Sequence, residues 1–176
     1  MKRYYKSIIL VAIIALLFCN LSCSSQEQDK QRRKSEIEQF AEKINSNPII
    51  LNEQNADTLL HLYSNYIKDF PKDAMCDYYL FQMSNLYSNM KNCDSALYCL
   101  DRIIKEYPKG QKVGAAYFFK GVVLNDVCLN KEESIKAFQT YIEKFPKSKQ
   151  VETAKRLMQL DTMRNPENIL QQDTNK

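Results

Sequence analysis

The residues of this chain that are best suited to chemistry are its cysteines and its one histidine. Four of the six cysteines lie in the body of the chain, as Cys76, Cys93, Cys99 and Cys128, and the histidine is His61. They form neither a Cys-x-x-Cys nor a His-Glu-x-x-His motif, there is no Gly-rich phosphate loop, and Asp and Glu are scattered singly. We therefore expect no enzymatic activity, no cofactor and no metal site, and a packed or surface position for His61.

A disulfide is one role open to these cysteines. Cys93 and Cys128 fall in corresponding turns of two adjacent repeats, described below, on the same edge of the stack. A disulfide needs Cα atoms within about 7 Å, whereas packed helices lie about 8–10 Å apart, so the bond requires the two turns to lean together. The alternative is that all four cysteines are free, partly buried thiols.

A sequence block that occurs twice organises the chain around these residues. Aromatic-Pro-Lys segments place Pro71, Pro108 and Pro146 at intervals of 37 and 38 residues. A fixed period in this range indicates stacked units, and the apolar spacing makes each unit a pair of helices. Few glycines (three) and no tryptophan also favour an all-helical chain over a β-sandwich.

The apolar stripes predict where the helices lie. Residues 56–70 form the second helix of a degenerate first repeat, and a helix from 73 to 90 opens the next repeat. Its partner helix, capped by Asp94, carries a stripe that ends at Tyr107. The third repeat follows the same plan with stripes over 113–124 and 135–145, and a more polar helix over 148–163 caps the array.

Certain positions recur because the two helices of each pair must pack closely. Small residues allow the backbones to approach, larger ones fill the next groove, and proline ends the second helix. Gly121 costs a helix about 1 kcal/mol relative to Ala, so close packing is its expected reason. The recurring residues are Ser84, Tyr87, Ala96, Leu100 and Pro108 in one unit, and Gly121, Leu124, Ser134, Phe138 and Pro146 in the next.

The spacing of these residues resembles the signature of tetratricopeptide repeats. The resemblance implies an all-α fold of tandem antiparallel helix hairpins, a tetratricopeptide-like α-solenoid over 56–163 with a C-terminal capping helix. Residues 164–176 are expected to be a disordered tail.

The N-terminus reads as an export signal. Lys2, Arg3 and Lys6 precede an apolar run from Ile8 to Phe18 that as a helix would rise only about 16 Å, well short of a membrane core of about 30 Å. Cleaving off this signal, residues 1–22, takes the formal net charge from +4 to +1. So weak a positive charge gives no electrostatic footprint for nucleic acid.

The end of this signal resembles a bacterial lipobox, with Ser22 directly before Cys23. The resemblance implies that Cys23 is lipidated and becomes the new N-terminus; plain secretion and an uncleaved short anchor are the alternatives. Residues 23–34 would then be the lipidated N-terminus and a flexible tether, and 35–55 an N-terminal helix and linker. The absence of Asp after Cys23 is similar to outer-membrane sorting signals, so we expect a lipid anchor in the bacterial envelope, at the periplasmic face of the outer membrane.

Together, the repeat period, the aromatic-Pro-Lys ends and the lipobox resemble the outer-membrane-assembly lipoproteins (BamD/YfiO-like) and the repeat domain of the Tol-Pal coordinator. Both resemblances imply that the chain contacts other proteins of the cell envelope. The chain would then be either a protein–protein interaction adaptor or a structural subunit of an outer-membrane assembly or envelope transport complex. An enzyme accessory or hydrolase is disfavoured by the absent motifs.

In stacks of this kind the first helix of each pair lines the concave surface. Aromatic rings with interspersed amides on that surface suit an extended peptide or a helix from a protein partner, and no small-molecule substrate is evident. The alternative is that the N-terminal or capping helix folds back and buries Phe81 and Phe118 as core. The expected binding residues are Tyr78, Phe81, Asn85, Ser88, Phe118, Val122 and Asn125.

Overall fold

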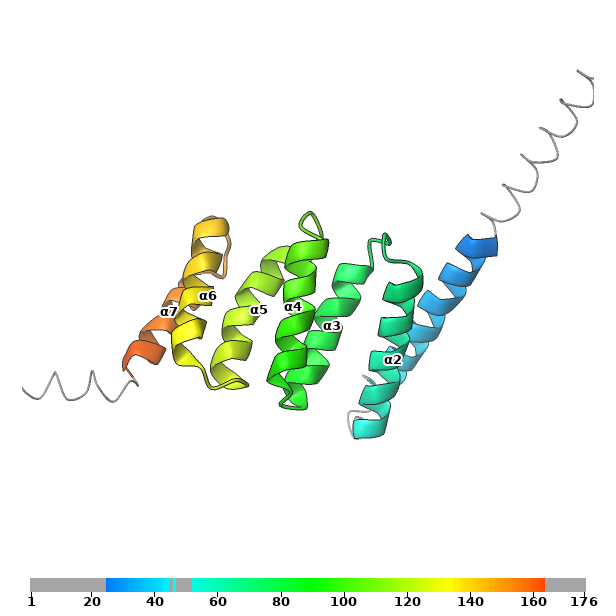
Figure 1. Ribbon diagram of the computed structural model, residues 1–176, viewed down its shortest axis with the longest axis horizontal. Helices are drawn as coiled ribbons and strands as arrows, with labels where there is room; N and C mark the ends of the chain where they lie inside the picture. The colour runs from blue at the N-terminus through cyan, green and yellow to red at the C-terminus, as the bar shows by residue number, and fades with distance from the viewer. Residues whose placement is uncertain (1–24, 45, 47–51, 164–176) are drawn as a thin grey trace, which may run out of the picture. The chain divides into compact units, whose positions relative to one another are not determined.

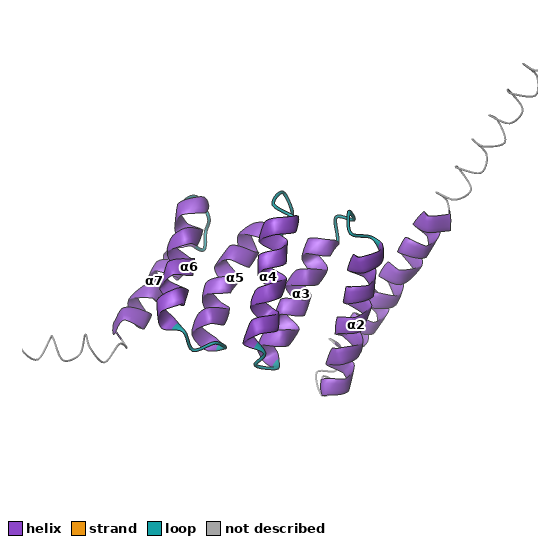
Figure 2. Cartoon of the chain, viewed as in Figure 1, coloured by secondary structure: helices purple, strands orange, loops and turns teal. Residues whose placement is uncertain are grey.

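The computed structural model describes residues 25–44, 46 and 52–163, and these fall into two compact units that divide between Phe70 and Pro71. The elements within this described part are all α-helices joined by short turns, with no strand (Figures 1 and 2). The predicted all-α fold class is therefore confirmed. The predicted signal peptide 1–22, Cys23 and the predicted tail 164–176 lie outside the described residues.

The first unit contains a helix over residues 25–44 followed by α2, Glu53–Asp69. The prediction of a flexible tether up to residue 34 is wrong, because the helix already includes residues 25–34. Ion pairs one turn apart stabilise this polar stretch: Lys30 with Glu27 at 2.5 Å, and Arg33 with Asp29 at 2.9 Å. Side-chain pairing thus replaces the apolar periodicity whose absence suggested a tether.

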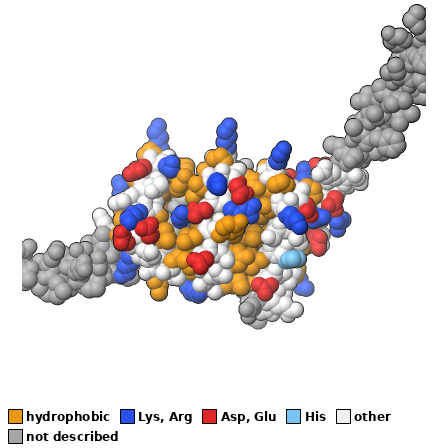
Figure 3. Space-filling model, viewed as in Figure 1, with side chains coloured by type: hydrophobic (Ala, Val, Ile, Leu, Met, Phe, Trp, Pro, Cys, Tyr) orange, Lys and Arg blue, Asp and Glu red, His pale blue; other side chains and the backbone are white. Residues whose placement is uncertain are grey.

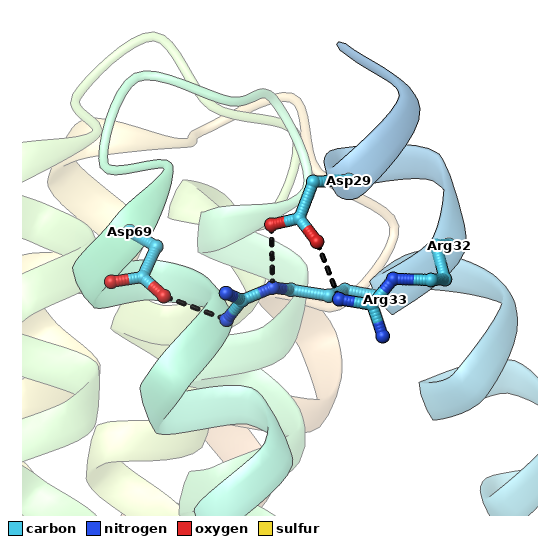
Figure 4. A network of polar contacts seen from close by, with 4 residues as sticks. All are labelled: Asp29, Arg32, Arg33 and Asp69. Carbon is cyan, nitrogen blue, oxygen red and sulfur yellow. Dashed lines mark hydrogen bonds and ion pairs between the residues drawn. The ribbon is translucent and has the colours of Figure 1, made fainter. Parts of the chain in front are cut away.

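The helix over 25–44 packs antiparallel against α2. The guanidinium of Arg33 bridges Asp29 on its own helix and Asp69 on α2, at 2.6 Å from the Asp69 carboxylate (Figure 4). Arg33 also lies over the ring of Phe70, and Lys34 over that of Tyr66. The prediction that the first repeat keeps only its second helix is therefore corrected: α2 has a partner helix.

The second unit consists of five consecutive helices. They are α3 (Cys76–Asn89), α4 (Cys93–Glu106), α5 (Val113–Asp126), α6 (Lys131–Lys144) and α7 (Val151–Met163). Each helix packs against the next, and α3 also touches α5, so α3–α4 and α5–α6 form two stacked hairpins with α7 as the C-terminal helix (Figure 1). This is the predicted solenoid of helix hairpins.

The second helix of each hairpin begins with the same cap. The side chain of Asn92 accepts a hydrogen bond from the backbone N–H of Ser95, and the side chain of Asn130 accepts one from Glu133, both at 3.1 Å. An asparagine in this position satisfies one of the free N–H groups at a helix start. The expectation that Asp94 is the cap is wrong, since Asp94 lies in the first turn of α4.

Close packing inside the hairpins centres on the recurring small residues. Ser84, Ala96, Leu100, Ser134 and Phe138 are fully buried. A Cβ atom placed on Gly121 would come within 2.6 Å of the Phe138 ring, so only glycine lets α5 and α6 approach this closely. Of the other predicted packing residues, Gly121 and Leu124 are buried, Tyr87 is half-buried, and Pro108 and Pro146 are exposed just beyond the helix ends.

The turns inside the two hairpins are equivalent and covalently linked. Lys91 and Leu129 occupy the same turn position, and each has a positive φ, 58° and 55°. Cys93 and Cys128 form a disulfide with Cα atoms 5.2 Å apart, and Cys76 and Cys99 are buried thiols outside this bond. Of the two alternatives for the cysteines, the structure has the disulfide, because the neighbouring turns lean together, and the four-thiol alternative is corrected.

The junction between the hairpins depends on a buried aspartate. Asp77 at the start of α3 is 3% exposed and accepts a hydrogen bond from the backbone N–H of Lys112, the N-cap residue of α5, at 2.8 Å. A Cβ atom on Gly110 would lie 2.3 Å from the Asp77 carboxylate, so glycine is required in this loop. Asp77 therefore caps a helix of the following repeat and fixes α5 relative to α3.

None of the helices within the described residues has both the length and the apolar character needed to cross a membrane.

Candidate protein-binding face

One side of α3 carries a ladder of polar side chains between aromatic rings. The side-chain amide of Gln82 donates to the Tyr78 hydroxyl at 2.7 Å, and the amide of Asn85 donates to the Gln82 carbonyl at 3.3 Å. These residues follow one another by three and four positions, so they share one helical face, and all three are half-buried. The Asn85 amide oxygen and one N–H of each amide take no part in these two hydrogen bonds and can pair with a peptide backbone.

An aromatic pair continues this face from α3 to α5. The rings of Phe81 and Phe119 lie 5.5 Å apart, and both residues are half-buried. The ammonium of Lys112 lies 5.1 Å from the ring centre of Tyr78 and 5.7 Å from that of Phe81. We call this surface the A-helix face, because its residues lie on or directly before the first helix of a hairpin. It consists of Tyr78, Phe81, Gln82, Asn85, Lys112 and Phe119.

The structure places the seven predicted binding residues in four different settings. Tyr78, Phe81 and Asn85 lie on the A-helix face. Ser88 does not: it is buried, and its hydroxyl donates to the Ser84 carbonyl at 2.7 Å. Asn125 is half-buried and donates to the Asp126 carboxylate at 2.8 Å.

Phe118 and Val122 belong to a separate terminal cluster. Phe118 packs its ring 5.6 Å from Phe138 and 5.3 Å from Tyr141, and Val122 packs against the same buried residues. Ala154 of α7 is fully buried in this cluster, so the C-terminal helix covers it. Phe118 and Val122 are each half-buried, as Phe81 is, and they pack against this cluster, so part of each side chain contacts core residues.

Phe81 and Phe118 occupy equivalent positions in the repeat, but their neighbours on the next helix differ. By the repeat spacing, Phe119 occupies the position that faces Phe81, and Leu157 of α7 occupies the equivalent position facing Phe118. Leu157 belongs to the terminal cluster, whereas Phe119 pairs with Phe81 on the A-helix face. The two predicted aromatics thus take different roles.

Sequence reasoning missed three residues of this face. Gln82 follows Tyr78 by one helical turn, and Phe119 precedes the packing position Gly121 by two residues, so helical spacing could have identified both. Lys112 lies in the loop before α5, and only the three-dimensional contact with Tyr78 and Phe81 reveals its position.

The groups with potential for catalysis do not come together. His61 is exposed on α2, and among the described residues no three His, Cys, Asp or Glu side chains are grouped closely enough to hold a metal ion. Burial raises the pKa of the Cys99 thiol to about 11 and also raises the pKa of Cys76. Both thiols therefore stay protonated and unreactive near neutral pH.

A hollow of about 250 Å³ lies between α4, α5 and α6, on other faces of these helices. Its charged residues already pair within the chain, Lys120 with Asp101 at 2.6 Å and Lys136 with Glu133 at 2.9 Å. The A-helix face instead offers half-buried aromatic rings and amides, which makes it the better binding candidate.

Comparison with protein families gives one match. Residues 78–110 match the family model described as "Tetratricopeptide repeat". The match covers nearly all of α3, the whole of α4 and the loop that ends at Gly110. No curated protein matches the sequence.

Proposed function

We propose that this chain, a tetratricopeptide-repeat protein with two stacked hairpins, is a membrane-anchored adaptor that holds a protein partner on its A-helix face. Tetratricopeptide repeats generally mediate protein–protein interaction, and one repeat of this chain matches their family model. The observation that carries the proposal is the Tyr78–Gln82–Asn85 ladder beside the Phe81–Phe119 pair. Rings supply contact area at low entropic cost, and amides fix the direction of a peptide backbone.

The second part of the proposal is the location, a lipid anchor at Cys23 in the bacterial envelope. The N-terminal sequence motif is its main support. The Cys93–Cys128 disulfide adds support, because such bonds persist in oxidising compartments such as the periplasm. Lipidation would be tested by the mass of the mature N-terminal peptide, with Cys23→Ser as the control that should lose both the lipid mass and the membrane association.

Photo-crosslinking in membranes tests the binding face. A photoreactive amino acid would replace Gln82 on the A-helix face or, as a matched control, Tyr98, which is 64% exposed on α4. We expect a defined protein adduct from position 82 and none from position 98. Adducts from both positions, or from position 98 alone, would contradict the assignment of the face.

A pair of variants then separates an adaptor from a structural subunit. Gln82→Ala/Asn85→Ala removes the ladder without touching the buried core, so the fold should be kept while an adaptor's partner is lost. A permanent subunit would keep its partner through the purification of this variant. Phe118→Ala is the contrasting variant, which should lose stability first because Phe118 packs in the terminal cluster.

A further inference from the structure

The loops that join one hairpin to the next carry exposed lysines at a fixed period. Lys72, Lys109 and Lys147 each follow the proline of an aromatic-Pro-Lys segment, and each is exposed. Proline restricts the backbone beside each lysine, so these side chains project from stiff turns. Together with their neighbours they form what we call the lysine edge of the second unit: Lys72, Lys105, Lys109, Lys112, Lys144, Lys147 and Lys149.

Lys and Arg side chains protrude along this edge in the space-filling view, where Figure 1 has the α4–α5 and α6–α7 loops (Figure 3). Within the described residues, none of the seven lysines forms an ion pair with a carboxylate. Lysines elsewhere in this unit do, including Lys120 with Asp101 and Lys155 with Glu152. The unpaired positive charge is thus concentrated at one edge.

The carboxylates near the lysine edge are mostly engaged in other contacts. Glu106 binds Arg102 through two hydrogen bonds of 2.9 Å, and Asp77 is buried against the backbone of Lys112. Asp73 accepts a hydrogen bond from the backbone N–H of Met75. Glu143 is the exposed carboxylate that remains, so lysines outnumber free acids clearly at this edge.

The opposite edge, which holds the disulfide, has the reverse balance. Its turns and the helix starts beside them carry Lys91 and Lys131 against four carboxylates, two of which, Glu132 and Glu133, bind Lys136. The second unit is therefore electrically polarised between its two edges, although the formal net charge of the whole chain is only +4. The four carboxylates are Asp94, Asp126, Glu132 and Glu133.

From this arrangement we propose that the lysine edge docks the second unit on an anionic lipid surface, with the ammonium groups contacting phosphate headgroups. A row of protruding loop tips meets a flat, multiply charged surface better than it meets one peptide, because the charges lie on the tips of separate loops. Four to eight clustered basic residues are what anionic membranes attract, at about 1 kcal/mol for each residue near the surface. This surface shares only Lys112 with the A-helix face, and its binding to lipid does not depend on the proposed partner binding.

Vesicle sedimentation with the full chain tests this proposal. The probes are vesicles of phosphatidylcholine alone and vesicles in which part of it is replaced by phosphatidylglycerol. The variant Lys109→Gln/Lys147→Gln removes two charges from the lysine edge, and Lys91→Gln/Lys131→Gln removes two from the opposite edge as a matched control. The N-terminal segment is identical in all proteins, so its own affinity for lipid cancels in the comparison.

We expect the wild type to prefer the phosphatidylglycerol vesicles and to lose that preference at high salt, because mobile ions screen surface charges. The lysine-edge variant should bind these vesicles about 10- to 30-fold more weakly, and the control should change less than about 2-fold. Equal losses in the two variants, or no preference for the anionic lipid, would overturn the proposal. So would a lysine-edge variant that binds lipid normally but no longer captures the partner protein, since the edge would then be a protein contact.

Discussion

The two hairpins of the second unit solve the same packing problem with different residues. In α5–α6 the close contact pairs Gly121 with Phe138, and α3–α4 has Ser84 and Leu100, both fully buried, at the corresponding repeat positions. The larger ring on α6 is accommodated by the absence of a side chain on α5. A larger side chain on the second helix is thus matched by a smaller one on the first, while the contact keeps its position in the repeat.

The hydroxyl groups at this contact also differ between the hairpins. The Ser134 hydroxyl donates across the contact to the Gly121 carbonyl at 2.9 Å, whereas Ala96 in the first hairpin has no such group. Ser84 instead donates to the Phe81 carbonyl of its own helix at 2.7 Å. The second hairpin is therefore joined by an interhelical hydrogen bond that the first lacks.

Cutting the disulfide is the largest expected perturbation, because it connects the turns of the two hairpins. The bond closes a loop with a sequence separation of 35 residues, for which a stabilisation of about 3–4 kcal/mol is expected. Urea unfolding of Cys93→Ser/Cys128→Ser should show this loss. Reductant should lower the free energy of unfolding of the wild type to that of the variant and leave the variant unchanged. If reductant does not change the stability of the wild type, the result counts against the bond.

Placing alanine at the matched position of each hairpin contact should separate the two hairpins by their packing. Gly121→Ala places a Cβ against the Phe138 ring and should cost about 1–3 kcal/mol, although Ala is the better helix former. Ser84→Ala, at the matched position, should change stability by less than about 1 kcal/mol, because Ser84 bonds only its own helix. The urea midpoints of the two variants, compared at equal denaturant dependence, measure both changes in stability. Equal losses of stability would mean that the packing of the two contacts does not differ.

The junctions that follow the two hairpins differ in chemistry as well. After α4 the Asp77 carboxylate receives the Lys112 N–H, and after α6 the Tyr141 hydroxyl donates to the Ser148 hydroxyl at 2.5 Å. Asp77→Ala should cost about 1–2 kcal/mol, since it leaves an N–H at a helix start without its cap. Tyr141→Phe should cost about 1 kcal/mol or less. Thermal unfolding of the two variants gives this comparison, and a larger loss in Tyr141→Phe would reverse the ranking of the junctions.

The smallest expected effect near neutral pH concerns a titrating group that only the first hairpin has. Cys99 of α4 corresponds by the repeat spacing to Ala137 of α6. Burial raises the pKa of Cys99 from 9.0 to about 11, so the unfolded chain ionises first as pH rises. This contribution to stability is complete below about pH 9 and is lost between pH 9 and 11. The free energy of unfolding of Cys99→Ala should fall less steeply than that of the wild type over this range, and identical slopes would argue against a buried neutral thiol.

Much of the fold could be predicted from the sequence because the repeat imposes a period on local signals. The prolines, the apolar stripes and the small residues at Ser84 and Gly121 predict the helix pairs. The helix over residues 25–34 was missed because its support comes from ion pairs such as Asp29–Arg33 rather than an apolar face. That spacing of opposite charges was visible in the sequence and could have corrected the prediction.

The candidate site could be predicted less completely, because it depends on which helix comes next in the stack. Tyr78 and Asn85 followed from helical spacing alone. Phe118 did not, since its burial depends on the residues that α7 supplies to the terminal cluster. Lys112 was invisible for a similar reason: a loop residue reaches the A-helix face only once the following hairpin is in place.

The central claim is that a small residue on the first helix of a hairpin makes room for a large one on the second. A double-mutant cycle at Gly121 and Phe138 tests this claim most directly. Phe138→Leu recreates the larger residue of the first hairpin, Leu100, opposite position 121. We predict that Gly121→Ala, destabilising by about 1–3 kcal/mol in the wild type, becomes neutral or stabilising in the Phe138→Leu background. The same loss in both backgrounds would contradict the account.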